Sequence, residues 1–222
     1  MHRYYKTEGI IVKRRNFGEA DRILTVLTKN YGKIQVKAPG VRKITSRRSS
    51  HIELLNLARF TLYRSFRVTL PIVTEAQTQE EFLTIKNNLK KIGLAYYICE
   101  LIDRFCAQNQ ENRTVFFLVR DTLFRLADLK VGPVWESFSR HSGNSERSVE
   151  ASRISIDERD SGQARMTKSG GELSIIEDFE DELLIALGFL SKSHQLKDRA
   201  AFIENILERK LTTKRLLPLF IS

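Results

Sequence analysis

The chain has few of the residues that build covalent cross-links or metal sites. Its two cysteines, Cys99 and Cys106, are seven residues apart in a helical pattern, which separates their α-carbons by about 10 Å at about 1.5 Å per residue. Because a disulfide tolerates no more than about 7 Å, we expect two free thiols on an apolar helix face. The four histidines form neither an i, i+4 pair nor a zinc-type spacing with the cysteines, so no metal site is expected.

Long hydrophobic runs are also missing. No window approaches the roughly eighteen uncharged apolar residues that a membrane span needs. The N-terminal stretch MHRYYKTEG lacks the apolar segment of a secretory signal. Both absences favour a cytoplasmic protein, associated with the nucleoid if its partner is DNA.

Signatures of catalysis are scarce as well. The sequence contains no Gly-x-Ser-x-Gly elbow. Residues 162–169, GQARMTKS, nearly match a phosphate-binding loop, but Thr167 stands where the second glycine belongs and no strong strand precedes the stretch. We therefore expect no catalytic residue and no cofactor, and we interpret the chain as a non-enzyme.

Negative charge is scarce in the first third of the chain. Residues 1–79 carry 16 Lys and Arg against 5 Asp and Glu, whereas the rest carries 21 against 22, so all of the net charge of +10 arises from this region. Such asymmetry is typical of a polyanion binder, because each neutralised phosphate releases condensed counterions. The alternative is a basic surface that serves solubility alone.

The first third is built of short β-like runs separated by turn signals. Strands are expected near residues 10–12, 23–28, 34–37, 58–63 and 68–73, with turns at 16–18, 30–32 and 38–40. Five short strands suit a small closed barrel, of which the oligonucleotide-binding (OB) barrel is the commonest version that binds nucleic acid. Closure also removes exposed strand edges.

Helical periodicity replaces this pattern after Thr78-Gln79-Glu80-Glu81, which has the form of a capping box. Apolar stripes follow at residues 98–106 and 116–127, and return at 179–190 and, after an expected cap at Asp198, at 202–207. The fold class predicted is α+β, with a five-stranded OB-fold domain at residues 1–79 and an all-helical domain at residues 80–222.

Two segments of the helical domain are polar. Between about residues 137 and 174, ten serines and four glycines predict a polar, possibly disordered insertion. An acidic cluster follows at residues 177–182, where metal binding is conceivable. The simpler interpretation is that these carboxylates occupy the first turns of a helix and complement its dipole.

The basic residues of the first domain gather at strand ends and loops, which in OB folds rim the groove for single-stranded nucleic acid. The candidate phosphate contacts are Lys13, Arg14, Arg15, Arg22, Lys33, Lys37, Arg42, Lys43, Arg47, Arg48, Arg64 and Arg67. Aromatic side chains near turns are candidates for base stacking, with core packing as the alternative for each. These are Phe17, Tyr31, Tyr63 and Phe66.

Several segments carry a specific resemblance. They are TEGIIVKR at residues 7–14, NFGEADRILT at 16–25, YGKI at 31–34, GVRK at 40–43 and ERKLTTKRLL at 208–217. The first four resemble the opening, and the last the closing segment, of the RecO family of bacterial recombination and repair proteins. The resemblance implies a recombination mediator with an OB domain and a helical domain. It also implies binding to single- and double-stranded DNA, annealing of complementary strands, cooperation with RecR, and help for RecA in displacing single-strand-binding protein.

The chain departs from the family in one respect. Many members carry a four-cysteine zinc module where this chain has its cysteine-free polar insertion, so metal binding is not carried over. Within the motif, Gly18 is expected to supply a turn with positive φ and Asp21 to bond local backbone, while Arg22 alone has the charge that suits DNA. An RNA-binding factor for ribosome or transcript handling remains the main alternative, and a nuclease or nucleotidyltransferase accessory the other.

Overall fold

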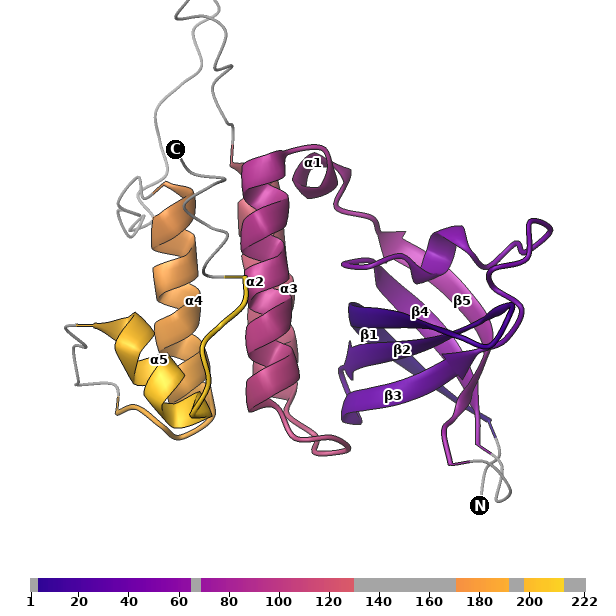
Figure 1. The fold of residues 1–222 in the computed structure, drawn as a ribbon, viewed down its shortest axis with the longest axis horizontal. Coiled ribbons are helices and arrows are strands. Elements are labelled where there is room, and N and C mark those ends of the chain that lie inside the picture. The colour runs from indigo at the N-terminus through magenta and orange to yellow at the C-terminus, as the bar shows by residue number, and fades with distance from the viewer. Residues whose placement is uncertain (1–3, 65–68, 130–170, 192–197, 214–222) are drawn as a thin grey trace, which may run out of the picture.

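A computed structural model describes residues 4–64, 69–129, 171–191 and 198–213 of the chain. The strands are β1 (Tyr4–Phe17), β2 (Asp21–Thr28), β3 (Gly32–Ala38), β4 (Leu57–Tyr63) and β5 (Ile72–Glu80). The helices are the 3-10 turn η1 (Ser50–Ile52), α1 (Leu83–Lys86), α2 (Leu89–Phe105), α3 (Arg113–Asp128), α4 (Glu172–Ala186) and α5 (Arg199–Leu207). Strands gather at one end of the molecule and helices at the other, with α2 and α3 beside the barrel (Figure 1).

The strands close into a barrel in the order β1-β2-β3-β5-β4, so the predicted α+β fold with a closed five-stranded barrel is confirmed. The long strand β1 closes it by pairing with β2 along one part and with β4 along another. The pairing of β3 with β5 is parallel and short, joining Lys37 to Ile72. Other neighbouring strands run antiparallel.

The apolar run Ile10-Ile11-Val12 is buried throughout because both faces of β1 are covered. Successive side chains of a strand point to opposite faces. Ile11 therefore packs inside the barrel, whereas Ile10 and Val12 join a second core shared with the helices. A strand covered on both sides carries a continuous apolar run rather than an alternating one.

The helices are capped by side chains at their amino ends. Asn88 accepts a hydrogen bond from the Lys91 N–H at 3.0 Å, and Asn112 does the same for Val115. Asp198 accepts from the Ala201 N–H, which confirms the cap expected at Asp198. Each bond satisfies one of the donors that the first turn of a helix leaves free.

The fifth strand lies later in the chain than residues 68–73, where it was expected. It begins at Ile72 and continues to Glu80, so the interpretation of residues 78–81 as a capping box is wrong. The Thr78 hydroxyl instead contacts Nδ1 of His51 at 3.0 Å, and Glu80 accepts a hydrogen bond from the Phe82 N–H at 2.9 Å. The chain then turns through Phe82, whose φ of 52° is left-handed, into α1.

The acidic cluster at residues 177–182 lies in the middle of α4 and not in its first turns, because that helix begins at Glu172. Its carboxylates hold neighbouring helices: Asp178 pairs with Arg125 at 2.8 Å, and Asp181 pairs with Arg199 at 2.7 Å. The early start also makes residues 172–174, the last of the expected insertion, helical. Residues 137–170, including the loop-like GQARMTKS, lie outside the described part.

The two cysteines are free, as the spacing predicted. Cys99 lies on α2, and burial raises its pKa to about 12. Cys106 differs from expectation because α2 ends at Phe105 and Cys106 has extended backbone. No helix in the described ranges has the length and apolarity needed to cross a bilayer.

The barrel meets the helices where the β2–β3 turn touches the loop between α2 and α3. The Asn109 N–H donates to the Lys33 carbonyl at 2.8 Å. Nearby, the Phe117 ring lies between two cations, with Lys29 Nζ at 5.4 Å and the Arg120 guanidinium at 4.7 Å from its centroid. The two units are therefore joined by a backbone hydrogen bond and by the cation–π contact of Lys29 with Phe117, whereas Arg120 belongs to α3 itself.

Candidate nucleic-acid interface

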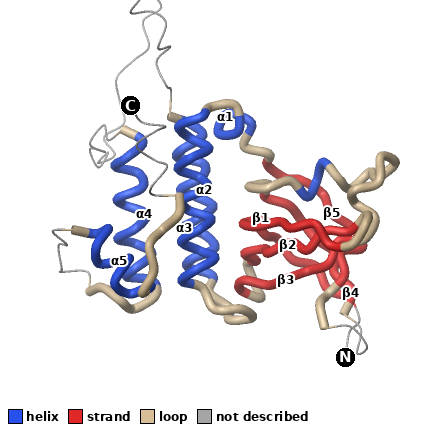
Figure 2. The backbone as a smooth tube through the Cα atoms, in the orientation of Figure 1, coloured by secondary structure: helices blue, strands red, loops and turns tan. Residues whose placement is uncertain are grey.

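The motif around Gly18 forms the turn between β1 and β2, at the end of the barrel away from the helices (Figure 2). Gly18 has a φ of 58°, which supplies the positive-φ turn between β1 and β2. Asp21 accepts a hydrogen bond from the Gly40 N–H at 2.8 Å and pairs with Lys37 at 2.9 Å. The Lys37 hydrogen bond, with that of Gly40, holds the pKa of Asp21 below its usual range. Asp21 thus bonds backbone as expected, but of a distant loop rather than its own turn.

Arg42 adds to these contacts between the two loops, because its backbone N–H donates to the Ala20 carbonyl at 2.9 Å. Its guanidinium donates to the Gly18 carbonyl at 3.1 Å while the side chain stays exposed. The turn after β1 and the loop after β3 are therefore held together as one surface. This surface lies at the end of the barrel away from α2 and α3, as the tube in Figure 2 shows.

Four of the predicted phosphate contacts are exposed on this surface. They are Arg15, Arg42, Lys43 and Arg47, and we call them the basic end. Within residues 4–64 and 69–129, none of the four forms an ion pair with a carboxylate. Their charge is thus available to a ligand, and the hydrogen bonds of Asp21 and Arg42 hold this surface in place.

Other predicted contacts are paired within the protein. Lys13 pairs with Asp103 of α2 at 2.7 Å. Arg14 and Arg22 share the carboxylate of Glu53, Arg22 at 3.2 Å. Surface ion pairs of this kind are weak, so these cations are only partly neutralised and a phosphate can still compete for them.

Lys33 and Arg48 have structural roles. The Lys33 side chain is buried, and its ammonium donates to the Asp103 carbonyl near the end of α2. Burial lowers the pKa of Lys33, with Asp103 opposing the effect. The Arg48 guanidinium donates to the carbonyls of Val73 and Pro39 at 2.6 and 2.8 Å. We leave both out of the proposed interface, and Arg67 lies outside the described residues.

Replacing Lys33 by methionine tests this division. The change leaves the Asp103 carbonyl without its charged donor, so it should lower the free energy of unfolding by about 1 to 3 kcal/mol. The salt dependence of binding to single-stranded DNA should not change. Urea denaturation and a salt titration of binding measure the two effects. A stable variant with a shallower salt dependence would show instead that Lys33 contacts phosphate.

The aromatic candidates occupy two places. Phe17 is 47% exposed at the basic end, where Lys37 Nζ lies 5.1 Å from its ring centroid. Tyr31 and Tyr63 lie on the other side of the barrel, each against a tyrosine of β1. Those partners, Tyr4 and Tyr5, were not among the predicted candidates, although their adjacent rings at the start of the first strand form a visible pattern in the sequence. Phe66 lies outside the described residues.

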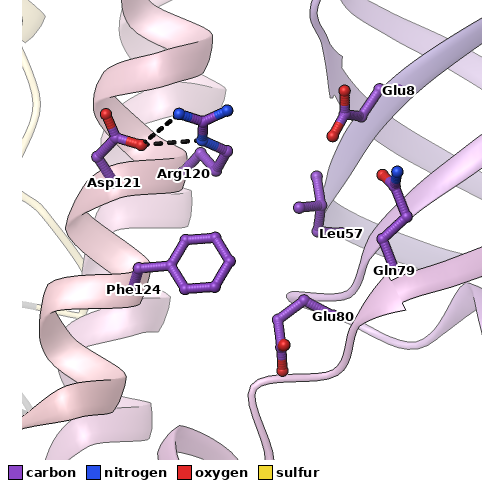
Figure 3. A pocket seen from close by; sticks show the side chains of 7 residues that line it. All are labelled: Glu8, Leu57, Gln79, Glu80, Arg120, Asp121 and Phe124. Carbon is purple, nitrogen blue, oxygen red and sulfur yellow. Dashed lines mark hydrogen bonds and ion pairs between the residues drawn. The ribbon is translucent and has the colours of Figure 1, made fainter.

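A hollow of about 520 Å³ between the barrel and α3 has the wrong charge for nucleic acid. Figure 3 shows Glu8 and Glu80 on the barrel side, Arg120 and Phe124 extending towards them from the helix, and Asp121 behind Arg120. The one arginine there, Arg120, pairs with Asp121 at 2.7 Å. Carboxylates repel phosphates, so this hollow is not part of the interface. Among the described residues, no group of His, Cys, Asp or Glu could hold a metal ion.

Comparison with known proteins gives two adjoining family matches. The model described as recombination protein O N terminal matches residues 1–82, and the one described as recombination protein O C terminal matches residues 86–137. Together they extend from the first strand to beyond α3.

Curated relatives agree with these matches. The chain is 41% identical over 122 residues to the DNA repair protein RecO of Dehalococcoides mccartyi strain BAV1, covering 55% of this chain and 47% of the relative. It is 40% identical over 121 residues to that of Roseiflexus sp. strain RS-1, covering 54% and 42%. The protein of Pelotomaculum thermopropionicum is 34% identical over 123 residues, covering 55% and 47%. These alignments span less than half the length of each relative.

Proposed function

Because this chain belongs to the RecO family, we propose that it is a recombination mediator of DNA repair that acts by binding rather than by catalysis. In this proposal it binds single- and double-stranded DNA and anneals complementary strands. With RecR, it helps to load RecA on DNA coated by single-strand-binding protein. The observation that carries the proposal is the exposed, unneutralised basic end of a closed OB-type barrel.

The basic end fits a phosphate backbone better than it fits any particular base sequence. Lysine and arginine neutralise phosphates whatever the bases are. Arg42 and Lys43 belong to a loop that is fixed by backbone hydrogen bonds, so little order has to be gained when a strand binds. We therefore expect binding of low sequence specificity that weakens steeply with salt.

The helical unit is the proposed dock for protein partners. Its side nearest η1 exposes three large apolar side chains, Leu83, Leu89 and Tyr96, at 56%, 65% and 40%. They lie on α1 and α2, apart from the basic end. Exposed apolar side chains that are close together favour protein contacts rather than phosphate contacts.

An annealing assay tests the proposal. Complementary strands are coated with single-strand-binding protein, and the rate of duplex formation is followed with and without this protein. The proposal predicts faster annealing, and addition of RecR and RecA should then give RecA filaments on the coated strand. DNA binding without any annealing would reduce the protein to a DNA binder. A competition titration in which RNA outcompetes DNA of the same sequence would favour the RNA-binding alternative.

A further inference from the structure

The barrel has a second hollow, a groove of about 850 Å³ on a side that the basic end does not reach. Three walls form it: the start of β1 with the β2–β3 turn, the chain before β5, and the loop between α2 and α3. Tyr4, Tyr5, Tyr31 and Arg64 line it from the barrel, and Gln108 and Asn109 line it from the helical unit. The volume falls in the range of small-molecule sites.

Tyrosine rings dominate the barrel wall. Tyr5 and Tyr31 meet edge to face with centroids 4.8 Å apart, and Tyr4 meets the neighbouring Tyr63 at 4.9 Å with their planes tilted by 47°. Neither arrangement stacks one ring flat on another, and much of the Tyr4 and Tyr31 rings stays open to solvent. Tyr4 is 60% and Tyr31 41% exposed, although both rings are large and apolar. Rings left open in this way are platforms for another flat ring.

The charges in the groove are few. Arg64 is exposed on its barrel side, and Glu111 lies on the helical side. Burial raises the pKa of Tyr5, with Arg64 opposing this, so its hydroxyl is neutral at physiological pH. The remaining polar side chains are the Thr69 hydroxyl and amides, among them Asn30 and Gln35. Amides and hydroxyls can both donate to and accept from the edges of bases.

We propose that this tyrosine groove binds the unstacked bases of a single strand, while the basic end holds the phosphate backbone of single strands and duplexes alike. The inference rests on the proposed function and deepens it. Bases that are stacked and paired inside a duplex do not offer their faces to a protein. The groove therefore gives the barrel a preference for single strands that the basic end alone does not provide.

The composition of the groove favours nucleic acid over a protein segment as its occupant. Open aromatic faces with a single arginine beside them are how proteins hold single strands without reading their sequence. The groove also belongs to a closed OB-type barrel, a fold that commonly binds oligonucleotides. A bound protein segment is the competing occupant, and the experiment below separates the two.

The test replaces Tyr4 and Tyr31 together by leucine, which keeps apolar bulk and removes the rings. Binding is measured by fluorescence anisotropy on a labelled single strand and on a blunt duplex of the same sequence. Affinity for the single strand should fall about tenfold or more, since stacking on one base is worth about that much. Affinity for the duplex should stay the same. The salt dependence should stay the same for both ligands, because no phosphate contact is removed.

Two controls keep the result interpretable. Phe124→Leu removes a similarly exposed ring from α3, in the acidic hollow that lies outside the interface, and should leave binding to both DNAs unchanged. Replacing Tyr4 and Tyr31 by phenylalanine keeps the rings and should preserve single-strand binding. If the phenylalanine variant loses binding as much as the leucine variant does, or if the leucine variant binds single strands normally, the inference is wrong. Failure of the unaltered protein to bind either DNA would instead refute the proposed function.

Discussion

Replacing Gly32 by alanine should be the most damaging single substitution in the barrel, lowering the free energy of unfolding by about 4 kcal/mol or more. Two independent features of the β2–β3 turn lead to this value. Gly32 has a φ of 64°, which costs any residue with a Cβ about 1 to 2 kcal/mol. A Cβ there would also lie 1.8 Å from the Gln110 carbonyl oxygen and 2.4 Å from its carbon. Both are backbone atoms that cannot rotate away.

Gly40→Ala is the matched control for this substitution. Gly40 has nearly the same φ, 67°, but the nearest atom to its would-be Cβ is the flexible Lys43 Cδ at 4.0 Å. Its cost should be limited to the same backbone cost of positive φ, about 1 to 2 kcal/mol. Urea denaturation of both variants gives the comparison. Equal losses of stability would show that the loop between α2 and α3 does not approach Gly32 closely.

Replacing Arg42, Lys43 and Arg47 together by alanine should weaken single-strand binding about a hundredfold at low salt. Each lost phosphate contact lowers the slope of log affinity against log salt by about 0.7, so the slope should become shallower by about 2. Stability should change little, because all three side chains are exposed and the Arg42 backbone keeps its bond to the Ala20 carbonyl, so only the exposed bond from the Arg42 guanidinium to the Gly18 carbonyl is lost. Anisotropy titrations over a range of salt concentrations measure the affinity and the slope together.

A variant of equal charge provides the control. Arg113, Arg209 and Lys210 are exposed on the helical unit, and replacing them by alanine removes the same positive charge. Their loss should leave the slope nearly unchanged if contact matters rather than net charge. Equal slopes for the two triple variants would mean that the overall field of the protein, and not the basic end, attracts DNA. Arg48 is omitted from the set because its guanidinium makes part-buried bonds to backbone carbonyls, whereas the single such bond of Arg42 is exposed, so loss of Arg48 would confound stability with binding.

The sequence predicted the barrel well because local signals coincide with its turns. Gly18, Gly32 and Gly40 all have positive φ and all follow runs of strand-forming residues. The fifth strand was misplaced for a physical reason. In β5 Val73 is the one buried side chain, and six of the seven residues from Thr74 to Glu80 are polar, so the sequence carries little strand signal. Its antiparallel pairing with the preceding strand β4 along its whole length is what makes this stretch a strand, and such pairing is not visible in the residues of β5 alone.

The binding surface could be predicted only in part, because a sequence does not show which charges are paired. Lys13 pairs with Asp103, ninety residues further along the chain, and Arg14 pairs with Glu53, 39 residues further along. Lys33 had the same charge and the same strand-end position as the others, yet its ammonium is buried at a helix end. Composition located the basic domain, whereas only the fold separates the exposed cations from the internal ones.

Because Gly32 lies against the backbone of Gln110, the β2–β3 turn of the barrel packs directly on the loop between α2 and α3. Tyr31 of this turn lines the groove, while Lys33 beside it accepts the hydrogen bond of Asn109, which lines the groove from the helical side. A ligand that touches both walls binds only while barrel and helices keep this one arrangement. Occupancy and interdomain geometry are then reciprocally linked, each stabilising the other by the same free energy. A partner that moved the helices away from the barrel would lower the affinity for single-stranded DNA without contacting the DNA.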